Sequence, residues 1–438
     1  MKNSKLKSIL QFIVLCAGGN AIFYVIFMRS SFYEAFLEAF TMTNEQFGVL
    51  FSCYAWVAVA TYFLGGIVAD KVSTKVLMVI SFAGTGLLNI WFGTFPKYET
   101  ALLIYALMGV TTTLTFWAAL LKATRQFGQS VGSESKAFGG LEAGKAIFEV
   151  IFGTLAVFLF TKFAVMSAGL RFVIFMYGGI LILLAIISLF VFDNGTGDEA
   201  VISEESPFKL LLQCLKNVDI WICALMGAGA YAIGSTLGSY CGDIVGSNYG
   251  ATVAVMGYVG VMTAYFKPFG GLGAGWFGDK FGPSAVLLIL SIVLTGFAVV
   301  FAFLPTGPEY IWLFLVLFAV EIVCTGAFRS QKYATIKEAR VPMSLSGTAF
   351  GFMATIIYAS DAFLPPVIGR FLDTYDSVTA YRYTMLILAG FGLLSVVLCL
   401  IFRYRNKNNI KEILVEEKEA KSLRKEAKQK SARAESMC

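Results

Sequence analysis

The sequence predicts an all-α membrane protein with twelve transmembrane helices arranged as two six-helix halves. Three observations lead to this fold class: an apolar composition, twelve long apolar runs, and short motifs that recur in the same order in both halves. Of the 438 residues, 58% are hydrophobic and 14% are charged, whereas soluble domains carry about 25% charged residues. Too few polar side chains are present to cover the folded chain, so we expect lipid to surround it.

Each apolar run is long enough to cross a bilayer, since a hydrocarbon core about 30 Å thick needs roughly 20 helical residues. The stretch 194–216 predicts a cytoplasmic linker between an N-terminal bundle, 1–193, and a C-terminal bundle, 217–403. Residues 404–438 mix charges of both signs and are expected to form a solvated cytoplasmic tail. The predicted spans are 9–29, 46–69, 76–95, 101–121, 138–160, 172–192, 218–240, 252–277, 284–304, 310–328, 346–367 and 381–402.

Basic residues in the loops predict the orientation, because short cytoplasmic loops carry an excess of Lys and Arg. With the N-terminus placed in the cytoplasm, the inner loops hold fifteen Lys and Arg residues and the outer loops hold six, the tail left out. Both termini are therefore expected to be cytoplasmic, in the plasma (inner) membrane of a prokaryote.

Three short motifs recur in the two halves at nearly constant spacing, which predicts parallel repeats of one six-helix design. The matched pairs are 66–71 with 275–280 (G-x-x-x-D-K, 209 residues apart), 122–125 with 329–332 (two basic residues, 207 apart) and 137–139 with 349–351 (Ala-Phe-Gly, 212 apart).

The first pair resembles the loop signature of the major facilitator superfamily of secondary transporters, G-x-x-x-D-[RK]-x-G-x-[RK], and the resemblance extends from the first span to the last. The first copy departs from it at Ser73 and Thr74, whereas the second keeps the later glycine. The resemblance implies loops that gate the cytoplasmic face through carboxylates capping a neighbouring helix; a purely structural role is the alternative. The implied gating residues are Gly66, Asp70, Lys71, Lys75, Gly275, Asp279, Lys280 and Gly282.

Ionisable side chains inside predicted spans are costly in lipid and usually mark a transport pathway. Glu142, Lys145 and Glu149 are three and four residues apart, so a helix places them on one face, which must meet protein or a wet cavity. We expect Lys145 to contact substrate or a gate, with a glutamate changing protonation. The alternative is an ion-pair ladder that only holds helices together.

Lys267 lies near the middle of another span and is followed by Pro268 and several glycines. Proline removes a helix hydrogen bond, and transporter sites form at discontinuous helices near the midplane. A broken helix with Lys267 facing the cavity is therefore expected. Glu321 and Asp361 also lie within spans, and Glu321 could instead pair with Lys267 in a structural role.

Further candidate site residues are named because of where they lie in the predicted spans. Arg29, near the outer end of the first span, could line the outer mouth or act as an interfacial anchor. Lys122 and Arg329 hold equivalent inner positions and could line the cytoplasmic vestibule, although ordinary loop charge also explains them. Polar and aromatic residues in the spans that line the cavity in this family are weaker candidates: Asn20, Tyr24, Trp117 and Tyr231.

The sequence argues against enzyme function, because no nucleophile–base constellation and no Walker motif appear. Histidine is absent and the cysteines lack metal spacing, so neither a metal nor a cofactor is expected, nor nucleic acid as a partner. Transport energy would come from solute or proton gradients, as in a symporter or antiporter. Lys145 and Lys267 favour a small organic anion, carried by a monomer in lipid. A proton-coupled transporter of neutral or amphipathic solutes, sugar-like or drug-like, stays open, as does a transporter-derived sensor without flux.

Overall fold

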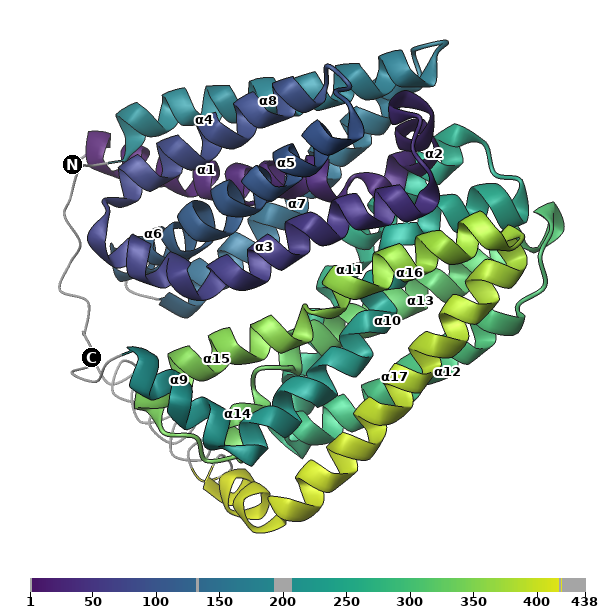
Figure 1. The fold of residues 1–438 in the computed structure, drawn as a ribbon. Coiled ribbons are helices and arrows are strands. Elements are labelled where there is room, and N and C mark those ends of the chain that lie inside the picture. Colours follow the sequence, from purple (N-terminus) through teal and green to yellow (C-terminus); the bar gives the residue numbers. More distant parts are fainter. Residues whose placement is uncertain (1, 131–133, 193–206, 417–418, 420–438) are drawn as a thin grey trace, which may run out of the picture.

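The computed structural model consists of two helical bundles that contact each other at one end and diverge towards the other (Figure 1). It describes residues 2–130, 134–192, 207–416 and 419, and the regular structure of these residues is helical. The N-terminal half contains α1 (Lys2–Phe27), α2 (Arg29–Phe40), α3 (Asn44–Lys71), α4 (Thr74–Phe92), α5 (Tyr98–Gly109), η1 (Val110–Trp117), α6 (Ala118–Ser130), α7 (Glu134–Phe160) and α8 (Met166–Val191). The C-terminal half contains α9 (Pro207–Lys216), α10 (Val218–Tyr249), α11 (Val253–Phe281), α12 (Pro283–Phe303), η2 (Pro308–Tyr310), α13 (Ile311–Gln331), α14 (Thr335–Glu338), α15 (Met343–Ile357), α16 (Ser360–Thr374) and α17 (Ser377–Arg405).

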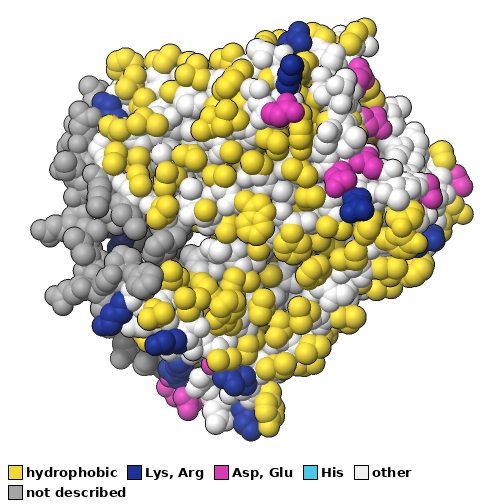
Figure 2. Space-filling model, viewed as in Figure 1, with side chains coloured by type: hydrophobic (Ala, Val, Ile, Leu, Met, Phe, Trp, Pro, Cys, Tyr) yellow, Lys and Arg dark blue, Asp and Glu magenta, His cyan; other side chains and the backbone are white. Residues whose placement is uncertain are grey.

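Ten helical segments among the described residues are long and apolar enough to cross a membrane. Three of them join more than one helix: Tyr98–Gly128 runs through α5, η1 and α6, Pro308–Gln331 through η2 and α13, and Thr348–Thr374 through α15 and α16. The long helices α3 and α11 occupy two further predicted spans but lie outside this set, so the count of twelve and the placement of the termini stay predictions. Apolar side chains cover most of the described surface in Figure 2, as lipid contact requires.

Some predicted spans are not single uninterrupted α-helices. The first ends at the junction of α1 and α2 at Met28, and the chain kinks again within α2 at Phe32, which is non-helical with φ −135° and ψ 33°. The eleventh divides between α15 and α16 at Tyr358, and the fourth contains the π-helical turns of η1. Interruptions of this kind free backbone groups and redirect side chains, and they commonly occur at functional sites.

The expected break at Pro268 is wrong, because α11 continues through this residue from Val253 to Phe281. A proline costs a transmembrane helix one hydrogen bond, which tight packing against neighbouring helices can compensate. Here α13 lies directly against α11: a Cβ at Gly326 would collide with the carbonyl oxygen of Lys267, and one at Gly270 would collide with that of Val323. This glycine-mediated contact supports α11 on both sides of the proline.

The two halves meet at the end of the molecule that holds the start of α3 and the end of α16, which we call the far end. Glycines permit direct backbone contact there, since a Cβ at Gly48 would collide with Pro365 and one at Gly369 would collide with Asn44. The opposite end, which holds the start of α1 and the end of α17, is the terminus end. The bundles diverge towards it (Figure 1), and Figure 2 shows the surface hollowed between them.

The start of the charged tail is an amphipathic helix, with its charged residues exposed. Residues 407–416 are helical, and Ile410 and Ile413 are buried. Arg340 holds this helix through ion pairs of 3.1 Å to Glu412 and 2.9 Å to Glu416. The two isoleucines are three residues apart, so they lie on one face of the helix and make that face apolar. The composition of the tail does not reveal this face. Residues 417–418 and 420–438 of the predicted tail, like 194–206 of the predicted linker, lie outside the described residues.

Candidate functional site

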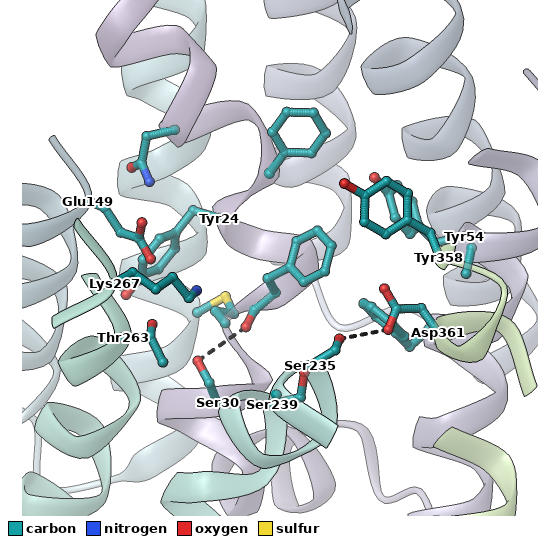
Figure 3. A pocket seen from close by; sticks show the side chains of 18 of the residues that line it. Tyr24, Ser30, Tyr54, Glu149, Ser235, Ser239, Thr263, Lys267, Tyr358 and Asp361 are labelled. Carbon is teal, nitrogen blue, oxygen red and sulfur yellow. Dashed lines mark hydrogen bonds between the residues drawn. The ribbon is translucent and has the colours of Figure 1, made fainter. Parts of the chain in front are cut away.

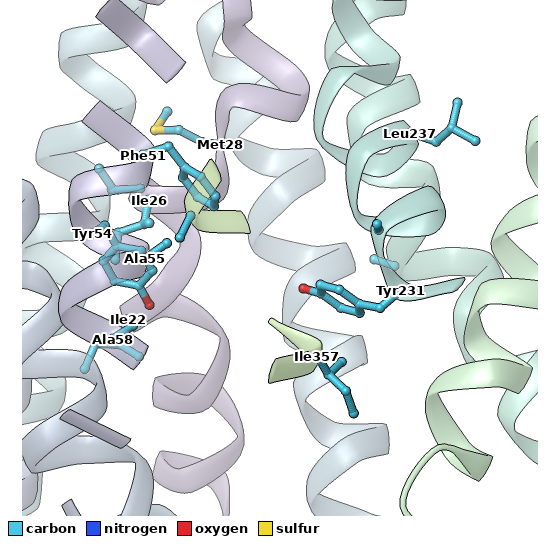
Figure 4. Close-up of a cluster of buried hydrophobic side chains, with 14 of the residues drawn as sticks. Ile22, Ile26, Met28, Phe51, Tyr54, Ala55, Ala58, Tyr231, Leu237 and Ile357 are labelled. Carbon is cyan, nitrogen blue, oxygen red and sulfur yellow. The ribbon is translucent and has the colours of Figure 1, made fainter. Parts of the chain in front are cut away.

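A cavity of about 350 Å³ lies between the two halves and is lined by residues from both. Phe51 and Tyr54 of α3 line it on one side and Tyr231 of α10 on the other, and Figure 4 shows these rings with buried apolar side chains of both halves around them. Ionisable and polar candidates from the sequence also line its wall: Asn20, Tyr24, Trp117, Lys145, Glu149, Tyr231, Lys267, Arg329 and Asp361.

On the N-terminal half, α7 places Lys145 and Glu149 on the cavity wall one helical turn apart. The Nζ atom of Lys145 lies 3.0 Å from Oε1 of Glu142 and 5.6 Å from the ring centre of Trp117. Glu142 itself does not line the cavity, and its side chain is 70% exposed. The three charges therefore do not form one buried ladder; Lys145 sits between an exposed partner and the cavity.

Lys267 projects from α11 of the other half into the same part of the cavity as Glu149, as Figure 3 shows. The two are close enough for their charges to interact. Glu321, the alternative partner of Lys267, is buried behind the wall, where Thr325 donates a hydrogen bond to its Oε1 at 2.6 Å. Lys267 thus faces the cavity with two acids nearby, Glu149 of the N-terminal half and Glu321 of its own half.

Asp361 lies in the first turn of α16, immediately after the break that separates it from α15. Its carboxylate accepts hydrogen bonds from the hydroxyls of Tyr231 at 2.8 Å and Ser235 at 2.7 Å, both from α10. Figure 3 shows the Ser235 bond and the position of Asp361 beside Tyr358. The break in the span lets this carboxylate face the cavity while both its oxygens have partners.

Arg329 also lines this wall, and Lys332 lies behind it. Lys332, which was not among the predicted site residues, is 4% exposed, and its Nζ donates a hydrogen bond of 2.8 Å to the Tyr358 hydroxyl. Arg329 lies one helical turn before it, with its guanidinium 5.3 Å from the ring centre of Tyr231. Arg329 and Lys332 form the second copy of a motif that recurs in the sequence. Because they are three residues apart, helical spacing could have placed both on one face.

Arg29 lies at the far end, outside the main cavity wall. Its side chain is buried, with the guanidinium carbon 4.2 Å from the ring centre of Tyr240 and 5.0 Å from that of Phe51. None of its three side-chain nitrogens has a hydrogen-bond partner among the described residues. A small space beside it shares Ser235 and Asp361 with the main cavity. Arg29 is therefore a buried cation held by aromatic rings from both halves.

The repeat equivalence of Lys122 and Arg329 does not extend to their positions. The Nζ atom of Lys122 donates a hydrogen bond of 2.8 Å to the carbonyl oxygen of Ala69, near the end of α3, and it does not line the cavity. A cation at a helix C-terminus is favourable because the last carbonyls lack partners. Arg329 faces the cavity, so the two halves use this position differently.

The predicted gating loops are described in part. The side chains of Asp70, Lys71 and Asp279, and the environment of Gly66, lie outside the described residues. Lys75 is half-buried in the first turn of α4, Gly275 is exposed in α11, and the ammonium of Lys280 lies 5.1 Å from the ring centre of Phe281. Gly282 adopts φ +87°, and a Cβ there would lie 2.5 Å from Oε1 of Glu338. The backbone conformation of this position favours glycine, and the absence of a side chain leaves room for the Glu338 carboxylate.

Comparisons with known proteins bear on the family and the fold of the chain. The family model of the Major Facilitator Superfamily matches residues 9–273 and 243–434. Inner membrane protein YihN of Escherichia coli (strain K12) is 28% identical over 431 residues, which cover 95% of this chain and 100% of YihN. Inner membrane protein YqcE of the same organism is 27% identical over 402 residues, 89% of this chain and 93% of YqcE.

Solved structures show the same fold. The nucleoside transporter NupG superposes with a TM-score of 0.70 at 17% identity, over 92% of this chain and 99% of NupG. A bacterial homologue of the human lysosomal transporter Spinster, in an inward-facing and unoccupied conformation, gives a TM-score of 0.72 at 14% identity, over 92% of this chain and 98% of the homologue.

Proposed function

Because the chain belongs to the major facilitator superfamily, it is a secondary transporter and not an enzyme, and we propose that it carries a small organic anion across the plasma membrane by alternating access. The charge of the cavity wall supports this substrate class. Lys145, Lys267 and Arg329 face the cavity, and both oxygens of Asp361, one of its two acids, already accept hydrogen bonds. A cleft with an excess of cations concentrates anionic solutes.

Arg329 is the cation best suited to hold a carboxylate. A guanidinium donates two parallel hydrogen bonds to a carboxylate, which an ammonium cannot do. The Nε atom of Arg329 is buried and has no hydrogen-bond partner among the described residues. Lys332, one turn further along α13, adds a second positive charge behind Tyr358. We therefore place the anionic group of the substrate at Arg329, with Lys267 nearby.

The size of the cavity favours a small solute. Ligand pockets commonly measure about 300–1,000 Å³, and this cavity, at about 350 Å³, lies near the lower limit. Tyrosine and tryptophan rings account for much of the remaining wall and would pack against the carbon skeleton of the solute. These rings are Tyr24, Tyr54, Tyr62, Trp117, Tyr231 and Tyr358.

With both termini in the cytoplasm, the contact at the far end and the divergence at the terminus end correspond to an inward-facing state. Rocking of the halves would close the terminus end and separate the far end. Arg29 packs on Tyr240 from the other half, so this separation would expose its unpaired nitrogens to the outside. We propose that Arg29 then contacts the anion before it reaches Arg329.

A proton-coupled carrier of neutral, ring-shaped solutes is the second candidate, because the same aromatic rings could stack on such a solute. NupG, a structural neighbour, is a nucleoside transporter. In this scheme Asp361 or Glu149, both on the cavity wall, would exchange the coupling proton, and the cations would serve to tune that exchange.

Solute counterflow in proteoliposomes tests the proposal. The purified full chain is reconstituted and assayed with carboxylic acids, sugars and nucleosides chosen by thermal-shift screening. We expect saturable counterflow of a carboxylate, reduced at least about tenfold in Lys267→Gln and Arg329→Gln, since a buried charged hydrogen bond contributes about 1.5–3 kcal/mol. The control is Lys97→Gln, an exposed loop lysine outside the cavity. Counterflow of neutral solutes only would favour the second candidate, and binding without flux would contradict transport.

A further inference from the structure

The carboxylate of Asp373, in the last turn of α16, crosses the boundary between the halves and caps the first turn of α3. Its Oδ1 accepts hydrogen bonds from the backbone nitrogen of Asn44 at 3.0 Å and from the Asn44 side-chain amide at 2.8 Å. Its Oδ2 accepts the backbone N–H of Glu45 at 2.8 Å. We propose that Asp373 is a gating residue that holds the far end closed; this inference rests on the alternating access proposed above.

The first turn of α3 uses acceptors from both halves of the molecule. A helix begins with backbone N–H groups that have no intrahelical partner, and the helix dipole favours a negative charge beside them. The Thr43 side chain accepts the N–H of Gln46 from within the N-terminal half. The N–H groups of Asn44 and Glu45 depend on Asp373, which lies 329 residues away from Asn44. The start of α3 is therefore fully capped only when α16 is in place.

This contact requires the halves to be in direct contact. Gly369, one turn before Asp373, packs on the backbone of Asn44 so closely that a Cβ would collide with it, and Gly48 packs on Pro365 in the same way. Protein N–H···O hydrogen bonds have donor–acceptor distances of about 2.7–3.2 Å. Separation of α3 from α16 at the far end would break all three bonds together. The Asp373 contacts are thus specific to one of the two states and lower its free energy relative to the other.

The chain contains a matched control three residues further on. Asp376 also caps a helix, accepting the N–H of Thr379 at 2.9 Å, and it is likewise exposed at the far end. Its partner is in α17 of its own half. Asp373→Asn and Asp376→Asn therefore make the same chemical change at the same end, but only the first one removes a bond between the halves.

Cys241 provides a native reporter of the far end. It is fully buried on α10, with its Sγ 3.9 Å from the carbonyl oxygen of Ser30 in the N-terminal half. Cys399 is also fully buried, but inside the C-terminal half, 3.8 Å from the sulfur of Met226. Opening of the far end would expose Cys241 to reagent and leave Cys399 protected, whereas general unfolding would expose both.

The experiment measures the rate of maleimide labelling of each cysteine by peptide mass spectrometry, on the full chain in lipid nanodiscs without substrate. Asp373→Asn is expected to raise the rate at Cys241 about fivefold, the effect of a typical N-cap substitution, with Cys399 unchanged. Asp376→Asn should match the native chain. Asn44→Ala removes the side-chain donor to Asp373 and also the acceptor of the Tyr33 hydroxyl, and it should give a smaller increase that exceeds that of Tyr33→Phe.

Equal labelling of Cys241 in Asp373→Asn, Asp376→Asn and the native chain would overturn the gating role, as would a parallel rise at Cys399. If Asp373→Asn cannot be purified, Asn44→Ala is compared with Tyr33→Phe, which removes only the hydrogen bond inside the N-terminal half. A higher Cys241 rate in Asn44→Ala supports the gate, and equal rates would overturn it. The assay uses no substrate, so its result is independent of the counterflow experiment. A chain without measurable flux could still show the gate, and a working carrier could lack it.

Discussion

The hydroxyl of Tyr231 donates a hydrogen bond to Oδ2 of Asp361 at 2.8 Å, joining α10 to the first turn of α16. With Ser235 on the other oxygen at 2.7 Å, the bond holds the carboxylate against α10. The same tyrosine ring lies 5.3 Å from the guanidinium carbon of Arg329. One side chain thus positions both the acid and the cation of the proposed anion site.

Removal of this hydroxyl is expected to weaken anion transport. In Tyr231→Phe the freed carboxylate can turn towards Arg329 and compete with the substrate, so the KM for a carboxylate should rise at least about tenfold, the scale of one charged hydrogen bond. The concentration dependence of proteoliposome uptake measures this. Tyr249→Phe, on the same helix but outside the cavity wall, should leave the KM unchanged. A native KM in Tyr231→Phe would remove Asp361 from the site.

Lys145 and Glu142 should differ sharply in importance despite their ion pair. Lys145→Ala is expected to abolish uptake while the protein remains folded, because the side chain lines the cavity. Glu142 is 70% exposed, and exposed ion pairs contribute only about 0–1 kcal/mol, so Glu142→Gln should change uptake less than about threefold. Initial uptake rates at matched protein content test both. Comparable losses in the two variants would restore the ion-pair ladder as the functional unit.

Arg29 should contribute to transport but not to stability. Burying a charge costs free energy unless it is paired and hydrogen-bonded, and the Arg29 nitrogens have no hydrogen-bond partner among the described residues. Even buried ion pairs can often be replaced by apolar side chains of similar volume without loss of stability. Arg29→Met is therefore expected to keep or raise the thermal unfolding midpoint in detergent, while uptake falls at least about tenfold. Arg29→Lys keeps a charge and should retain more activity. Lower stability together with normal uptake in Arg29→Met would contradict the proposed role in anion capture.

The two motif glycines of the second signature loop should respond differently to alanine. Gly282 adopts φ +87° and faces Glu338, so Gly282→Ala is expected to lower the unfolding free energy by about 1–3 kcal/mol, the cost of a strained backbone position. Gly275 lies in α11, and a Cβ there would have no atom within 4 Å, so Gly275→Ala should be neutral or stabilising by about 0.5–1 kcal/mol. Thermal unfolding monitored by tryptophan fluorescence compares them. Equal losses of stability in the two variants would contradict the strain at Gly282.

Much of the cavity wall was predictable, because a charge within an apolar run is costly in lipid and is retained chiefly where it faces protein or water. Lys145, Glu149, Lys267 and Asp361 were identified this way, and the structure places all four on the cavity wall. Their roles stay predictions. Helical periodicity did not separate Glu142 from its neighbours on α7, because spacing defines a face but not how far that face extends beyond the cavity. The predicted helix break at Pro268 was wrong for a related reason. The α13 helix packs against α11 and supports it there, and a contact between segments distant in the sequence cannot be read from local residues.

The sequence by itself determined the class of protein. Apolar runs of the length of a bilayer, with too few polar residues to cover them, require a membrane, and the recurring motifs indicate two related halves. Only the tertiary structure decided which charges meet. Arg329 faces the cavity while its repeat counterpart Lys122 binds the end of α3, and Asp373 reaches Asn44 across 329 residues. Such contacts depend on the rotation and tilt of packed helices, which local periodicity does not encode.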